Sequence, residues 1–80
     1  MDDVDAVLEA MAERGVTRAE LARMLGVRPP VVTQMLGRRQ SAMGADRLAR
    51  VMDALGYDLV FVPKGRRLPE GAKVYGGPRG

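Results

Sequence analysis

The sequence has no cysteine and no histidine among its 80 residues. Without cysteine the chain can form neither a disulfide nor a thiolate metal site, and without histidine it lacks the most common general base and zinc ligand. Its one serine and two threonines therefore have no histidine to activate them as nucleophiles. We expect an intracellular protein that is not an enzyme and that binds no metal and no cofactor.

Long apolar runs are also missing. No stretch approaches the roughly 20 apolar residues that a membrane-spanning helix needs, and the first residues are acidic where a secretory signal would be basic. A soluble, cytoplasmic protein is therefore expected. Eighty residues allow one domain with a small core, so homodimer formation would be a favourable way to bury more apolar surface.

Charged residues fall in blocks along the chain. Residues 1–13 carry five acidic side chains and no basic one, whereas residues 14–39 carry six arginines and a single acid, Glu20. Residues 64–80 form a second basic block, with five basic side chains and one acid. This pattern predicts one face that attracts polyanions and another that repels them, although an ordinary solvated surface can have the same pattern.

Two helices are predicted in the first third of the chain. Apolar residues at the spacing i, i+3, i+4, i+7 predict a helix over residues 3–14, ended by Gly15. Thr17 and Glu20 form a capping-box pattern, in which each side chain accepts a hydrogen bond from the backbone amide of the other residue. Val16 is placed to pack over this cap, and the second helix should end at Gly26.

Two more helices and a strand are predicted further along. Pro29 and Pro30 are tolerated in a first helical turn, so they can open a third helix over residues 29–36. A fourth helix should end at Gly56, and the β-forming residues 57–62 predict a strand that Pro63 stops. Its partner would be residues 72–75 of the same chain or the same strand of a second chain.

These elements predict a division into a helical domain (1–56), a strand (57–63) and a basic, Gly- and Pro-rich tail (64–80). The tail is expected to be extended, and three roles remain open for it: a DNA-binding arm, a partner-binding segment or plain solvent-exposed chain.

Residues 18–37 carry the most specific pattern. Ala22 is the small residue that lets two helices approach, and Gly26 is the turn residue between them. The expected shared core consists of Leu21, Leu25, Val27, Val32 and Met35. This pattern resembles the helix-turn-helix of the Xre/Cro family of phage and bacterial repressors. The resemblance implies a mainly α fold, a lambda-repressor-like domain of four to five helices with a short C-terminal β-strand or hairpin, and a nucleoid-associated regulator bound to double-stranded DNA.

The resemblance also implies which residues face DNA. In this family the second helix of the motif lies in the major groove, which would place Pro29, Pro30, Thr33 and Gln34 at the base edges. Gln34 is the strongest candidate, because its amide can pair with both N6 and N7 of adenine. Many relatives carry amide side chains where this chain has two prolines, so DNA shape is expected to contribute more to its specificity.

Phosphate contacts are expected around that helix. The candidates are Arg18, Arg28, Arg38, Arg39 and Ser41. Arg38 or Arg39 could instead reach a minor groove, and each arginine could also be an ordinary solvated surface charge.

The end of the fourth helix and the strand resemble the same region of HipB-like and HigA-like antitoxins. Some of these use such a strand to form an intersubunit sheet, which would make Tyr57, Leu59, Val60, Phe61 and Val62 dimerisation residues. Two functions stay open: a dimeric repressor on a palindromic operator, or an antitoxin or docking module for which DNA binding is secondary.

Overall fold

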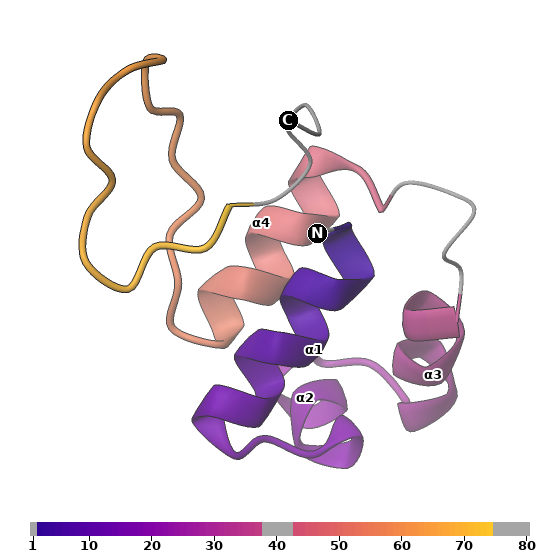
Figure 1. Ribbon diagram of the computed structural model, residues 1–80. Coiled ribbons are helices and arrows are strands. Elements are labelled where there is room, and N and C mark those ends of the chain that lie inside the picture. The colour runs from indigo at the N-terminus through magenta and orange to yellow at the C-terminus, as the bar shows by residue number, and fades with distance from the viewer. Residues whose placement is uncertain (1, 38–42, 75–80) are drawn as a thin grey trace.

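The computed structural model describes residues 2–37 and 43–74, and these contain four helices. In chain order they are α1 (Asp3–Arg14), α2 (Arg18–Leu25), α3 (Pro29–Gly37) and α4 (Ala45–Ala54). α2 packs most extensively against α3, while α1 and α4 pack on each other and close the core over that pair (Figure 1). The four predicted helices are therefore confirmed, with boundaries close to those expected.

The predicted helix caps are present. The hydroxyl of Thr17 accepts a hydrogen bond from the Glu20 amide at 3.1 Å, and the Glu20 carboxylate accepts one from the Thr17 amide at 2.9 Å. α2 ends at Gly26, whose φ of 71° lies in the left-handed region that glycine adopts without steric cost. This sharp end turns the chain directly toward α3.

One apolar core lies between the four helices. Leu21 and Val32 are fully buried, and Ala22 is 1% exposed where α2 meets α3. The expected core position of Val27 is wrong, because this side chain is 37% exposed. It lies in the turn between α2 and α3 rather than on the buried face of either helix. Leu25 is only partly buried against the core.

A buried carboxylate joins α1 to the chain that enters α4. Asp3 is 6% exposed, and its carboxylate accepts hydrogen bonds from the backbone amides of Val4, at 2.8 Å, and of Met43. These bonds offset the cost of burying the charge. Asp3 therefore fixes the point from which the chain runs into α4.

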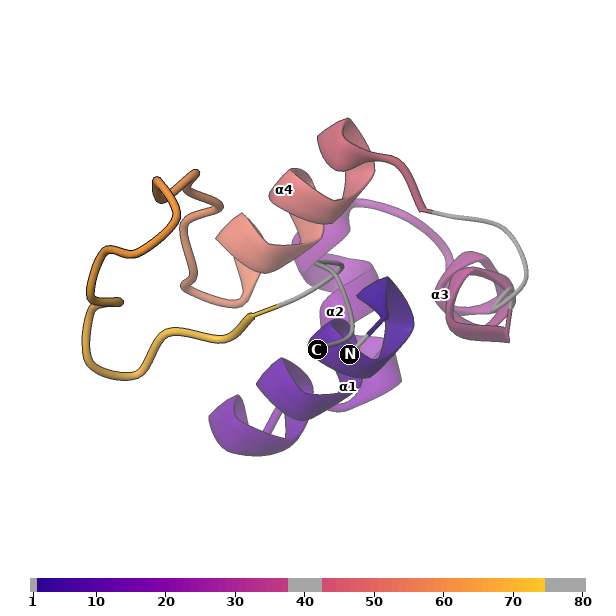
Figure 2. The same cartoon turned by 45° about the horizontal axis from the view of Figure 1, so that its top comes forward.

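The predicted C-terminal strand is not found among the described residues. Residues 57–63 have no assigned secondary structure, and residues 58–62 form no backbone hydrogen bond with another described residue. The expected pairing with residues 72–74 is absent as well, and Tyr75 lies outside the described residues. A strand requires a partner for its amides and carbonyls, and the described part of a single chain supplies none. Residues 57–74 instead form a loop on the side of the helices away from α3 (Figures 1 and 2).

Candidate nucleic-acid interface

α3 has a buried inner face and an exposed outer face. Val32, Met35 and Leu36 are buried in the core. The four predicted base-reading residues are all exposed, namely Pro29, Pro30, Thr33 and Gln34. The helix therefore presents these side chains together, on the surface that the core does not use.

Two further exposed residues on α3 were not singled out from the sequence. Val31 is 45% exposed, and it follows directly after the two prolines. Gly37 is exposed at the end of the helix, one turn after Gln34, and a Cβ built there would meet no described atom within 4 Å. Counting outward from the buried face at 3.6 residues per turn would have found both positions.

The prolines change what the start of α3 can bind. The first amides of a helix are free to bind phosphate, but Pro29 and Pro30 have no amide hydrogen to donate. The first helical amide with a partner is that of Val31, which donates to the Arg28 carbonyl at 2.9 Å. A phosphate near this end would therefore depend on the Arg28 side chain rather than on the helix terminus.

An exposed arginine stands at or just before the start of each helix of the α2–α3 pair. Arg18 opens α2 and Arg28 directly precedes α3, and neither forms an ion pair with a described residue. The only acid among residues 14–39 is Glu20. Its hydrogen bond with the Thr17 amide holds the pKa of this carboxyl below its ordinary value of 4.5, so it stays ionised within the cap. The remaining phosphate candidates, Arg38, Arg39 and Ser41, lie outside the described residues.

No described part of the 57–74 loop covers α3. The two views in Figures 1 and 2 agree that the loop and α3 lie on opposite sides of α1 and α4. The described residues thus leave the outer face of α3 uncovered, with the helical core behind it.

Comparison with known proteins agrees with this geometry. Residues 3–62 match the family model described as "Helix-turn-helix domain". The chain belongs to this family. No match was found among curated proteins or among solved structures. Membership of the helix-turn-helix family supports binding of double-stranded DNA, with α2 and α3 as the two helices of the motif.

The same helix-turn-helix family match extends past α4, into the first residues of the 57–74 loop. None of the described helices is long and apolar enough to cross a membrane. Residues 2–37 and 43–74 also contain no cluster of three or more acidic, cysteine or histidine side chains able to hold a metal ion.

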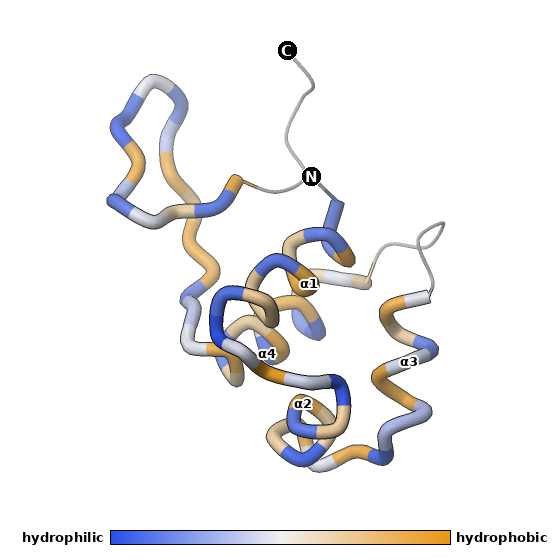
Figure 3. Tube along the Cα trace, turned by 60° about the horizontal axis from the view of Figure 1, so that its bottom comes forward, coloured by the Kyte–Doolittle hydropathy of each residue, from blue (hydrophilic) through white to orange (hydrophobic). Residues whose placement is uncertain are grey.

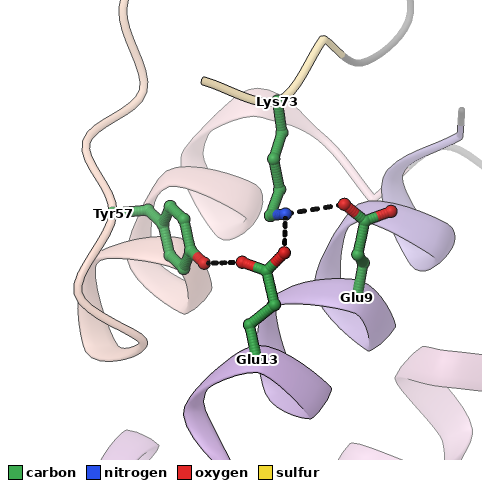
Figure 4. Close-up of polar contacts among 4 residues, drawn as sticks. All are labelled: Glu9, Glu13, Tyr57 and Lys73. Atoms are coloured by element: carbon green, nitrogen blue, oxygen red, sulfur yellow. Dashed lines mark hydrogen bonds and ion pairs between the residues drawn. The ribbon is translucent and has the colours of Figure 1, made fainter. Parts of the chain in front are cut away.

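The 57–74 loop is attached to α1 by polar contacts. The Lys73 ammonium donates hydrogen bonds to Glu9 at 2.6 Å and to Glu13 at 2.7 Å, and the Tyr57 hydroxyl donates to Glu13 at 2.6 Å (Figure 4). The Lys73 side chain is only 10% exposed. We call these four residues the α1 clamp. From the sequence, Lys73 is expected only within a basic tail and Tyr57 at a dimer interface, and neither expectation includes this contact with α1.

Charges and aromatic contacts strengthen the α1 clamp. Hydrogen bonds from Lys73 and Tyr57 lower the pKa of Glu13 from its ordinary value of 4.5. The hydrogen bond to Glu13 also raises the pKa of Tyr57 above 10.0. Hydrogen bonds to Glu13 and Glu9 raise the pKa of Lys73. The Arg14 guanidinium also lies over the Tyr57 ring, 4.8 Å from its centroid. The acidic face of α1 is thus partly neutralised within the chain.

The 57–74 loop leaves an apolar surface uncovered. Phe61 is 95% exposed and Val60 62%, while Leu59 and Val62 are also exposed. Residues 56–62 and 68–74, with Glu13 and Arg14, line an open groove of about 880 Å³. Figure 3 shows this run of apolar residues in the extended chain after α4. A protein surface seldom leaves so many neighbouring apolar side chains in water without a partner.

Proposed function

We propose that this protein is a sequence-specific transcriptional regulator of the Xre/Cro type, acting as a dimeric repressor on a palindromic operator. The observation that carries the proposal is the open outer face of α3, which displays Pro29, Pro30, Thr33 and Gln34 while its inner face is buried. A helix packed in this way behind a tight turn has the shape that enters a major groove.

The proposed contacts divide into two classes. Gln34 would hydrogen-bond to a base edge, and Thr33 would donate a hydrogen bond or offer its methyl group to thymine. Arg18 and Arg28 would bind phosphates and fix the register of the helix. The same role is proposed for Arg38, Arg39 and Ser41 in the connection that follows α3.

The proposed dimer forms through the exposed apolar run after α4. Residues 58–62 have backbone groups without described partners, next to the exposed side chains Leu59, Val60, Phe61 and Val62. Pairing of this segment with its copy about a two-fold axis would give the backbone groups hydrogen-bond partners and would bury the apolar side chains. Two α3 helices related in this way would bind half-sites about 34 Å apart, one turn of DNA. In this dimer Tyr57 would border the interface while it remains in the α1 clamp.

A second candidate function is an antitoxin or docking module. The groove beside Phe61 favours it, because an extended apolar segment of another protein would fit there as well as a second copy would. In that case the groove would be the principal binding site and contact with DNA would be secondary.

Selection of bound duplexes from a random library with the full chain tests the proposal. We expect a consensus made of two inverted half-sites. Affinity for the recovered duplex should then fall by orders of magnitude between about 50 and 200 mM salt, because arginine–phosphate contacts release counterions. Recovery of no consensus, or weak binding that is insensitive to salt, would favour the docking function instead.

A further inference from the structure

We infer that the outer face of α3 recognises A·T base pairs, with Gln34 bound to adenine and a set of apolar groups bound to thymine methyls. This inference rests on the proposed DNA-binding function and specifies the class of site that the helix accepts. It concerns only the base pairs beneath α3.

The first argument is the lack of charge on α3. Residues 29–37 contain no acidic and no basic side chain. In the major groove, guanine presents two acceptors that favour arginine or lysine, and cytosine presents a donor that favours a carboxylate. α3 offers neither partner. It therefore lacks the side chains that best select a G·C pair.

The second argument is the chemistry of Gln34. Its side-chain amide is exposed and carries one donor and one acceptor group side by side. Adenine presents the matching pair in the major groove, an N7 acceptor beside an N6 donor. Gln34 is the only residue of α3 that can form this bidentate contact.

The third argument is the apolar surface around Gln34. Pro30 lies four residues before it and Val31 three residues before it, so both are neighbours of Gln34 on the helix surface. Both are exposed, Val31 by 45%, and Thr33 adds a methyl group beside them. Thymine is the only base with a methyl group in the major groove. Burial of that methyl against Pro30 or Val31 would favour thymine over the other bases.

Packing within the chain does not explain these apolar side chains. Val31 is on the exposed side of a helix whose opposite face already supplies Val32, Met35 and Leu36 to the core. The described part of the 57–74 loop lies on the other side of the molecule (Figure 1). A thymine-rich groove is a partner of the right chemistry that can reach this position.

Base analogues in the selected duplex test the inference on the full chain. Replacing a thymine under α3 by deoxyuridine removes only its methyl group, and we expect affinity to fall about fourfold for a buried methyl. Replacing the contacted adenine by 7-deazaadenine removes the N7 acceptor, and we expect about a tenfold loss. Gln34→Ala should cost less affinity on the 7-deazaadenine duplex than on the adenine duplex, because only the hydrogen bond from adenine N6 to the Gln34 carbonyl is left to lose.

Two matched variants locate the methyl contact. Val31→Ala should reduce the sensitivity to deoxyuridine, whereas Val27→Ala, which alters a similarly exposed valine outside α3, should leave that sensitivity unchanged. A consensus with G·C pairs beneath α3, or a wild-type affinity indifferent to deoxyuridine, would overturn the inference while the DNA-binding function stands. Failure to bind any duplex would overturn both.

Discussion

Ala22 shows how a single small side chain permits the motif. It is 1% exposed where α2 crosses α3, whereas Ala19 on the same helix is exposed. Ala22→Leu should destabilise the fold by about 1–3 kcal/mol, because the added methylenes have no space in a packed core. Ala19→Leu makes the same change at an exposed position, and leucine and alanine have similar helix propensities, so it should change the free energy of unfolding by less than about 0.5 kcal/mol. Urea denaturation of both variants measures the difference, and equal stabilities would show that the α2–α3 contact is not tight.

Gln34 and Arg28 should differ in what their loss does to binding. Gln34→Ala removes a base contact, so it should cost about 1–3 kcal/mol on the preferred site and relax the preference at one base pair. Arg28→Ala removes a phosphate contact, so it should weaken binding to all sequences alike and reduce the salt dependence. Fluorescence anisotropy with a panel of single-base substitutions measures both effects. A changed base preference in Arg28→Ala, or an unchanged one in Gln34→Ala, would contradict these roles.

At the scale of the elements, the helices were predictable because their signals are local. The capping box of Thr17 and Glu20 and the turn at Gly26 each depend on residues within one or two helical turns. The strand was not predictable from residues 57–62, because strand formation depends on a partner that these residues do not specify. Exposed positions on α3 followed from its periodicity, although Val27 was wrongly assigned to the core and Val31 was passed over.

Contacts between distant segments were the other part that the sequence left open. Lys73 binds Glu9 and Glu13 across about sixty residues, and Asp3 binds the amide of Met43 across forty. All three acids belong to α1, but only Asp3 lies in its first turn, where a favourable interaction with the helix dipole is a sufficient local explanation. Nothing in the local sequence distinguishes a buried or clamped carboxylate from a solvated one.

The α1 clamp should depend on pH. The lowered pKa of Glu13 means that its stabilising contribution is present above pH 4.5 and is lost as the pH falls through the lower folded value. The raised pKa of Lys73 means that its contribution is present below pH 10.5 and is lost as the pH rises through the higher folded value. The loop should therefore stay attached at pH 7 and detach in acid near the lowered pKa of Glu13.

Chemical shifts of the Tyr57 ring report whether the 57–74 loop is attached to α1. Lys73→Ala should shift the ring resonances at pH 7 toward those of the acid form, because the ammonium that bridges Glu9 and Glu13 is gone. Lys64→Ala changes an exposed lysine of the same loop without an ion pair to a described residue, and it should leave the ring resonances in place. Identical spectra for wild type and Lys73→Ala would show that the α1 clamp does not hold the loop.

At the scale of the whole molecule, two surfaces lie on opposite sides of one small core. α3 is open on one side, and the apolar loop with Phe61 lies on the other (Figure 2). This arrangement allows the chain to bind DNA and a second protein surface at the same time. Partial neutralisation of Glu9 and Glu13 by Lys73 also reduces the negative charge on the loop side.

Phe61 tests the proposed dimer. Because it is 95% exposed, Phe61→Ala should leave the folding stability of the monomer unchanged. It should weaken the dimer by about 2 kcal/mol or more, as expected for a central aromatic residue of an interface. Met24→Ala removes another exposed apolar side chain, 49% exposed on α2, and should not affect dimerisation. Sedimentation equilibrium measures all three proteins, and a wild-type monomer or an unweakened Phe61→Ala dimer would contradict the proposed interface.

In the proposed function, the outer face of α3 is the surface that contacts DNA. Backbone amide chemical shifts of the full chain, recorded as the selected duplex is added, identify the contacting surface. We expect the largest changes in residues 28–37 and at the start of α2, with small changes in α1. Largest changes at Glu9, Glu13 and the 57–74 loop, with α3 unaffected, would contradict the claim.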